Sequence, residues 1–175
     1  MSSILFYTGG RCEPLGEHAV KAFENEELVT FLSTDIIGYD LDTKIHYLES
    51  SDHSEWRVRN GFDLDLDYID TDRCRYFILQ SVSDWAYKLV SREPNNFDPE
   101  YFIRRIECEL LRLIKEVRNA DANMIIIAYD VSHAVDPENK KEQLEQIVIS
   151  VIDRFIAEIA DGVTIFEFGI PRKIK

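Results

Sequence analysis

The sequence predicts an α/β fold of three layers, in which helices cover both faces of a mostly parallel central sheet. Two observations predict it. Short apolar runs alternate along the chain with longer segments that have apolar residues at helical spacing. The short runs are apolar on both faces, as strands buried in a parallel sheet are. The 175 residues suit a single domain, 1–175, and 45% hydrophobic residues are enough for a substantial core.

Five apolar runs are predicted to be the buried strands. All have the length of a strand, and four are rich in β-branched or aromatic residues. They span residues 4–8, 28–33, 76–79, 124–128 and 163–168. Because helical segments separate them, right-handed crossovers are expected between parallel neighbours.

Helical patterns fill the intervals between these runs. One long helix is predicted after Asp98 and Pro99, which suit the N-cap and first-turn positions. A second is predicted from Asp136 and Pro137, which have the same capping chemistry. Shorter patterns cover residues 17–23 and 84–90. The apolar stripes of all four are interpreted as core-facing surfaces.

Residues 62–68 alternate between apolar side chains and aspartates, as a half-buried strand does. The pattern places Asp63, Asp65 and Asp67 on one face. That face could be an acidic edge that binds a metal, or simply a solvated surface. Exposed charges need no ligand, which favours the second interpretation. The role of the acidic stretch 63–72 stays open at this point.

Charge and composition exclude several classes of function. A formal net charge of −13 disfavours nucleic acid as a partner, because a polyanion would be repelled. No apolar run approaches the length that spans a membrane, so no membrane association is expected. The three cysteines, Cys12, Cys74 and Cys108, lack the spacing of a zinc site or a disulfide framework. We therefore expect a cytoplasmic globular protein.

The segment after the first predicted strand has the frame of a phosphate loop. Gly9 and Gly10 follow the strand, a short turn comes next, and Gly16 precedes a helix. In open α/β sheets, ligands bind beyond the carboxyl ends of the strands and near helix N-termini. This frame predicts a P-loop NTPase-like (RecA-like) version of the α/β fold.

The chemistry of that loop is replaced. A working phosphate loop reads G-x-x-x-x-G-K-[ST], in which lysine neutralises phosphate and the hydroxyl holds Mg²⁺. Counting from Gly9, the last three positions are Pro14, Leu15 and Gly16. Proline removes an N–H donor, leucine removes the cation, and glycine removes the hydroxyl. Glu13 adds a negative charge, so every change opposes tight binding of a Mg-nucleotide.

Several segments resemble the bifunctional adenosylcobinamide kinase/adenosylcobinamide-phosphate guanylyltransferases of cobalamin biosynthesis. The resemblance extends over essentially the whole chain and is strongest near its C-terminus. The matching segments are Thr8-Gly9-Gly10, His18-Ala19, Phe77-Ile78-Leu79, Asp84-Trp85, Pro137-Glu138-Asn139 and Gly169-Ile170-Pro171-Arg172-Lys173-Ile174-Lys175.

This resemblance implies GTP or ATP with Mg²⁺ as cofactors and a corrinoid as a second ligand. It also implies a homo-oligomer, a trimer in that family. The positions that match its nucleotide-binding residues are Gly9, Gly10, Arg11, Gly16 and His18. Gln80 and Asp130 fall where it has metal-binding carboxylates, although Gln80 is a neutral and weaker ligand for Mg²⁺.

The guanylylated histidine of that family also has no direct counterpart. The frame Lys44-Ile45-His46-Tyr47 puts Tyr47 at its position and His46 one residue before it. A one-residue offset on a helix turns a side chain by about 100°. Both residues remain candidate catalytic positions, although the interpretation of His46 as an ordinary surface or core histidine is the favoured one.

Three hypotheses follow from the combination of family-like segments that are kept and catalytic residues that are replaced. The chain is a divergent member of that family whose phosphoryl and nucleotidyl transfer is weak or lost. Alternatively, it is an active cobinamide-processing transferase that uses substitutes such as Arg11 for the lysine and His46 or His18 as nucleophile. The third is a non-catalytic subunit that binds a small molecule or regulates a partner. A loop closed over itself by Pro14 and Leu15 would favour loss of the reaction.

Overall fold

The strands form one seven-stranded sheet in the order β3-β2-β4-β5-β1-β6-β7. The computed structural model describes residues 2–34, 56–131 and 137–175. Six strands are parallel to their neighbours, and β7 alone pairs antiparallel, with β6. The strands are β1 (Ile4–Gly9), β2 (Val29–Ser33), β3 (Arg57–Asn60), β4 (Tyr76–Gln80), β5 (Asn123–Tyr129), β6 (Gly162–Glu167) and β7 (Ile170–Lys173).

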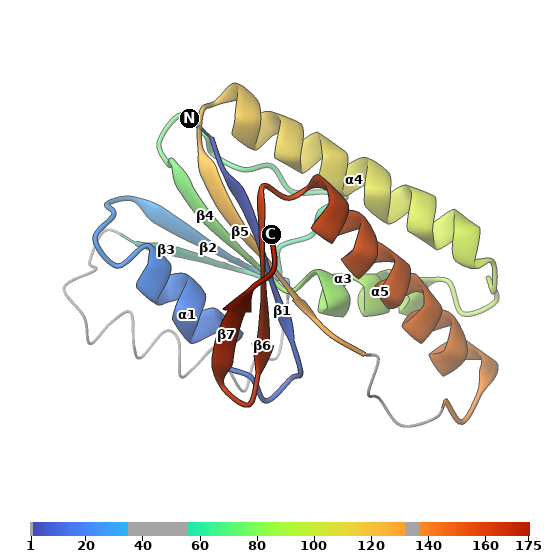
Figure 1. Cartoon of the computed structure of the whole chain (residues 1–175). Coiled ribbons are helices and arrows are strands. Elements are labelled where there is room, and N and C mark those ends of the chain that lie inside the picture. The colour runs from blue at the N-terminus through green and yellow to red at the C-terminus, as the bar shows by residue number, and fades with distance from the viewer. Residues whose placement is uncertain (1, 35–55, 132–136) are drawn as a thin grey trace.

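Helices lie on both faces of this sheet, as the alternating pattern predicted (Figure 1). On one face is α1 (Leu15–Ala22), whose Leu15, Ala19 and Val20 pack with Phe31 and Ile127. The other face is covered by α3 (Val82–Arg92), α4 (Pro99–Asn119) and α5 (Lys140–Ile159). The prediction of a three-layer α/β fold with a mostly parallel sheet is therefore confirmed.

The two long helices begin at capped residues. Asp98 is the N-cap of α4 and accepts a hydrogen bond from the Glu100 amide, with Pro99 in the first turn as predicted. For α5 the cap is Asn139, which accepts from the amides of Lys141 and Glu142. The predicted start at Asp136-Pro137 was therefore too early by one turn. Asp136 and Asn139 are both residue types that favour the N-cap position, and only the backbone geometry selects between them.

Sequence patterns missed the two edge strands, β3 and β7. Their side chains are almost all exposed, and β7 contains Pro171. An edge strand of this kind has no buried face, so it has no apolar alternation for a pattern to detect.

The alternating segment 62–68 is not a strand. It turns back on itself through the amides of Leu66 and Asp67, which donate to the Asp63 carbonyl at 3.1 and 2.7 Å. Phe62 and Leu64 are buried, whereas Leu66 is 73% exposed. The alternation of buried and exposed side chains therefore stops after Leu64, where the chain turns. The two buried side chains anchor a tight loop and do not belong to a strand.

All the parallel strands end at one edge of the sheet, and this edge positions the loop of residues 9–16. β1 lies between β5 and β6, so its last residue, Gly9, is flanked by Tyr129 and Phe166. The first crossover leads from β1 to α1 on one face, while the last leads through α5 on the other. The loop therefore lies where connections diverge to opposite faces, which is where α/β sheets bind ligands.

Candidate functional site

Gly9 is required by packing at the end of β1. A Cβ atom there would lie 2.8 Å from the Phe166 carbonyl oxygen, closer than real Cβ contacts, and 3.1 Å from the Phe166 Cβ, which is tighter than most. Gly10 is different, because its nearest neighbour would be the Glu13 Cγ at 3.9 Å. The first glycine of the loop is thus explained by the approach of β6, without any reference to a ligand.

The loop makes hydrogen bonds to itself. The Glu13 amide donates to the Gly10 carbonyl at 3.0 Å, and the Leu15 amide donates to the Glu13 carbonyl at 2.8 Å. Pro14, at the N-cap of α1, has no amide proton to offer and makes no side-chain cap. A phosphate cradle is made from backbone N–H groups that point at the ligand. Here several of those groups are engaged or missing.

Glu13 ties the loop to the turn between β6 and β7. Its two carboxylate oxygens accept hydrogen bonds from the amides of Phe168 at 3.0 Å and Gly169 at 2.6 Å. Both turn residues have positive φ, 54° and 75°. Two successive amides in such a turn form a small anion-binding concavity, and in this protein its anion is Glu13.

Leu15 and Gly16 occupy buried positions at the start of α1. Leu15 is 1% exposed and belongs to the core on this face of the sheet. The position at which a phosphate loop presents its lysine is therefore occupied by a core residue. His18 packs edge-on against Phe166, with 4.8 Å between ring centroids, and its Nδ1 lies 3.0 Å from the Pro14 carbonyl. That contact places a proton on Nδ1 and gives His18 a packing role.

The Arg11 side chain points away from the loop and pairs with Asp84 in the first turn of α3. Its guanidinium lies 2.7 Å from the Asp84 carboxylate and 5.3 Å from the centroid of the Tyr129 ring. Asp84 is itself held by Ser81, whose hydroxyl donates to it at 2.6 Å. The Arg11 side chain is 71% exposed, so the ion pair contributes about 1 kcal/mol or less to the free energy of unfolding.

Gln80 and Asp130 lie at the ends of neighbouring strands. The Gln80 amide nitrogen donates to the Tyr129 hydroxyl at 2.9 Å, and both side chains are buried. The Asp130 backbone amide donates to the Gly9 carbonyl at 2.9 Å. Within the described ranges, no group of three or more His, Cys, Asp or Glu side chains is arranged to hold a metal ion.

His46 and Tyr47 lie outside the described residues. Of the other residues singled out from the sequence, the structure brings Gly9, Gly10 and Asp130 together around one cavity. Gly16 and His18 lie behind the loop in the α1 layer, and Arg11 points to α3.

The acidic segment is neutralised by arginines. Asp63 accepts hydrogen bonds from the Trp85 indole at 3.0 Å and from Arg92 at 2.5 Å. Asp65 pairs with Arg105 at 2.6 Å, and Asp67 with Arg59 at 3.3 Å. Burial acts to raise the pKa of Asp63, but the hydrogen bonds from Arg92 and Trp85 outweigh it and lower that pKa. Asp63 and Asp65 fasten the turn to α3 and α4, and Asp67 fastens it to β3. The three side chains therefore pair with arginines and, within the described residues, do not form a metal-binding edge.

Sequence reasoning missed Asp153, a residue of α5 that lines the same cavity as Gly9 and Asp130. Burial raises the pKa of Asp153 to about 8, and the nearby charge of Asp130 adds to the rise. One signal could have revealed it: a carboxylate three and four residues from Ile156 and Ile149, inside an apolar stripe.

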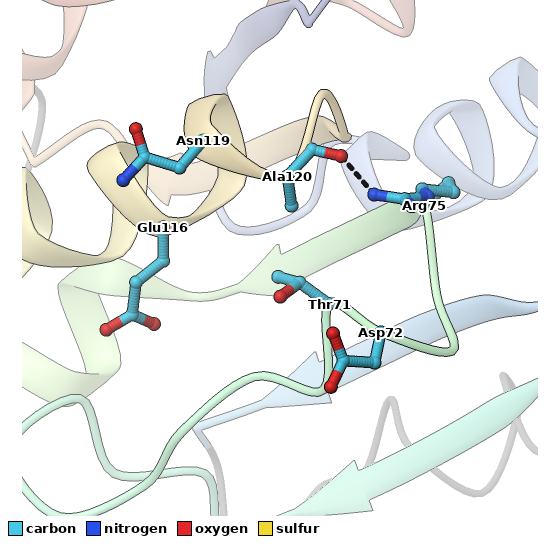
Figure 2. A pocket seen from close by; sticks show the side chains of 6 residues that line it. All are labelled: Thr71, Asp72, Arg75, Glu116, Asn119 and Ala120. Carbon is cyan, nitrogen blue, oxygen red and sulfur yellow. Dashed lines mark hydrogen bonds between the residues drawn. The ribbon is translucent and has the colours of Figure 1, made fainter.

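A second hollow, of about 450 Å³, lies at the opposite edge of the sheet, and Figure 2 shows its polar lining. Arg75 precedes β4 and donates to the Ala120 carbonyl beyond α4. Glu116 is paired with Arg112 at 3.0 Å. This edge holds the amino ends of the strands, which is not where open α/β sheets bind ligands.

Comparisons with known proteins support the fold and nothing finer. No family model matches the chain, and no curated protein matches it. A solved KaiC-like protein from the hyperthermophilic archaeon Pyrococcus horikoshii OT3 is similar in structure, with a TM-score of 0.55 and 16% sequence identity. The match covers 98% of this chain and 76% of that one. The fold is therefore the P-loop, RecA-like one. None of the described helices is both long and apolar enough to span a membrane.

Proposed function

We propose that this chain is a single-domain P-loop-fold protein of the adenosylcobinamide kinase/guanylyltransferase lineage that no longer carries out phosphoryl or nucleotidyl transfer. The observation that supports it most is the closed loop between β1 and α1. Its own Glu13 fills an anion-binding turn, and a core leucine stands where the lysine is required. In place of catalysis, we propose ligand binding or a regulatory role at the same edge of the sheet.

The loop does not suit a triphosphate. A nucleotide phosphate would meet the Glu13 carboxylate instead of a cation, and fewer free amides than a phosphate cradle presents. Restoring the lysine is also unfavourable, because Leu15 is in the core and burying a charge there is costly.

The metal positions are equally unsuited to Mg²⁺. The Gln80 amide is engaged with the Tyr129 hydroxyl, which leaves Asp130 as the one carboxylate of the pair expected from the resemblance. Phosphoryl transfer depends on positioning and on cations that stabilise developing charge. Losing a single such donor costs about 10²–10³ in rate, and this site lacks several.

The lineage part of the proposal rests on sequence motifs, and the structure gives local roles to the most specific of them. Asn139 of the P-E-N segment caps α5. The G-I-P-R-K-I-K segment forms the turn after β6 and the strand β7. Both motifs support the scaffold, which is consistent with a lineage in which the scaffold was kept and the reaction lost. Cobalamin as the pathway, a corrinoid as ligand and a trimer remain parts of this proposal.

The thermal stability of the purified chain with GTP or ATP tests the proposal. Millimolar nucleotide with MgCl₂ is expected to leave the melting temperature unchanged, because a ligand must bind the native state to stabilise it. The matched gain-of-function variant is Glu13→Ser with Pro14→Gly, which frees the turn amides and returns one loop donor while leaving the core Leu15 in place. It is expected to gain a measurable shift with nucleotide.

The competing reading, an active transferase with Arg11 as the substitute cation, predicts the opposite pattern. GTP would then raise the melting temperature of the unmodified chain, and Arg11→Ala would remove the shift. Because the Arg11–Asp84 pair is exposed and weak, Arg11 has the freedom to reach a phosphate. GTP-dependent phosphorylation of adenosylcobinamide by the purified protein would establish this alternative and overturn our proposal.

A further inference from the structure

A cavity of about 430 Å³ lies between α5 and the sheet, next to the closed loop. Phe6 and Thr8 of β1 and Val163 and Ile165 of β6 line one side, and Asp153 of α5 lines the other. Its volume falls within the range of sites that bind small molecules. It lies on the face of the sheet opposite α1 and extends to the closed loop, where Glu13 also lines it.

The walls of this cavity combine apolar surface with negative charge. Phe6, Ala157, Val163, Ile165 and Ile174 supply the apolar part. Four carboxylate residues, Glu13, Asp130, Asp153 and Glu167, also line it, and the described lining residues include no lysine, arginine or histidine. Two of the four are compensated from outside the cavity, because Glu13 accepts from two backbone amides and Glu167 lies 3.7 Å from Arg172. Such a cavity repels anions and attracts cations that have an apolar body.

Asp153 has an incomplete set of hydrogen bonds. Its Oδ1 is shut off from solvent, and no partner for it exists among the described residues. Buried polar atoms in folded proteins almost always have a partner, so an exception calls for an explanation. The torsion that turns an aspartate carboxyl group is soft, so either oxygen can rotate toward a ligand in the cavity at small cost.

We propose that this cavity binds a small organic cation, a primary amine or amidinium on an apolar body, with the cationic group against Asp153. The apolar body packs on Phe6, Val163 and Ile165, and the ammonium donates to the unsatisfied carboxyl group. A bare metal ion is disfavoured, since no group of three ligating side chains is found in the described part of the chain. It would also leave the apolar wall without a contact.

The experiment compares benzylamine with its neutral analogue, benzyl alcohol, by calorimetric titration of the full chain at about pH 8.5, where an alkylammonium keeps its proton. Benzylamine is expected to bind at least about tenfold more tightly than the alcohol, a difference of about 1.4 kcal/mol. Asp153→Asn should remove this preference. The matched control Glu158→Gln takes a carboxylate from the exposed side of the same helix and should keep it.

A second variant guards against a folding defect in Asp153→Asn. Ala157→Phe fills the cavity from the same helix without changing charge, and it should abolish binding of both probes while the chain stays folded by circular dichroism. Three results would overturn the proposal: equal affinities for amine and alcohol, a preference that survives Asp153→Asn, or no binding at about 10 mM, a concentration that detects even millimolar dissociation constants. Thermal stabilisation by MgCl₂ that Asp153→Asn abolishes would also overturn it, in favour of a metal site.

Discussion

Asp63 and Asp153 are both acidic side chains set among apolar residues, but their surroundings are opposite. Asp63 is met by an indole N–H, an arginine and a backbone amide. Asp153 has an oxygen with no partner among the described residues, and the charge that contributes to its pKa shift is that of another aspartate, Asp130. As a result the pKa of Asp63 is lowered, whereas that of Asp153 is raised to about 8. Removing a partner from a paired group such as Asp63 leaves the rest of the pair buried and uncompensated, whereas a carboxyl group with a strongly raised pKa in a cavity is a candidate functional group.

The same contrast separates two regions of the molecule. Around the 62–67 turn, carboxylates and arginines neutralise one another and join the turn to α3 and α4. Around the ends of β1, β5 and β6, four carboxylates line one cavity; Arg172 pairs with Glu167 there, but Asp153 keeps an oxygen without a partner among the described residues. We therefore expect substitutions in the first region to affect stability, and those in the second to affect binding and pH dependence.

Replacing Asp63 is expected to have the largest effect. Asp63→Ala removes the acceptor of the Trp85 indole N–H and of Arg92, and leaves a buried donor unsatisfied. The free energy of unfolding should fall by about 2–4 kcal/mol, less than for a fully buried pair because Arg92 is half exposed. Urea denaturation measures it. The control is Asp72→Ala, which replaces an exposed aspartate. An equal loss of unfolding free energy in that variant would contradict the stabilising role of the hydrogen bonds to Asp63.

Asp153 should give a smaller change, of opposite sign and dependent on pH. Because its folded pKa lies above its unfolded value of 3.8, the folded state holds the proton more tightly. This contribution to stability is fully present below about pH 4 and is lost as the pH rises through about 8.

Asp153→Asn escapes this loss. The variant should therefore be more stable than the unmodified chain by about 1–3 kcal/mol at about pH 9, and close to it at about pH 4 or below. Denaturation curves across this range measure the difference. If the variant and the unmodified chain were equally stable at both pH values, Asp153 would have to meet a partner in solution that offsets its burial.

Gly9→Ala tests the packing of the loop in the second region. The added methyl group would lie 2.8 Å from the Phe166 carbonyl oxygen, so we expect a loss of about 1–2 kcal/mol from overpacking. Gly10→Ala is the matched control, because its methyl group would meet nothing closer than 3.9 Å. Equal melting temperatures for the two variants would contradict the close approach of β6.

Arg11→Ala should have the smallest effect. The Arg11–Asp84 pair is largely exposed, so its loss should change the free energy of unfolding by less than about 1 kcal/mol. The change should shrink further in high salt, because exposed charges are screened. Arg73→Ala, in another exposed pair, is the control. A loss of several kcal/mol would mean that Arg11 anchors the loop to α3.

Most of the fold was predictable from local patterns. The five buried strands and both long helices were recognised because burial imposes a period on the residues of each element. The edge strands β3 and β7 were missed because they bury no face. The 62–68 segment alternates like a strand without being one, since two buried side chains imitate a period until a turn interrupts it.

The site was predictable only in part. Local sequence placed Gly9 and Gly10 after a strand and identified Pro14, Leu15 and Gly16 as departures from a working phosphate loop. The partner of Glu13 lies 155 residues away in sequence, at Phe168, and that of Arg11 lies 73 residues away, at Asp84. No spacing along the chain reveals such contacts.

By itself, the sequence determined the layered α/β fold and the absence of the phosphate-binding lysine and hydroxyl, because periodicity and residue identity are local properties. The tertiary structure alone decided what occupies their place: a loop closed by Glu13 on the β6–β7 turn, and beside it an acidic, apolar cavity around Asp153. Charge and desolvation act through space, so the same residue type has different roles at two positions. The Asp63 carboxylate joins two elements through its hydrogen bond to Arg92, whereas the Asp153 carboxyl group has an oxygen without a partner among the described residues.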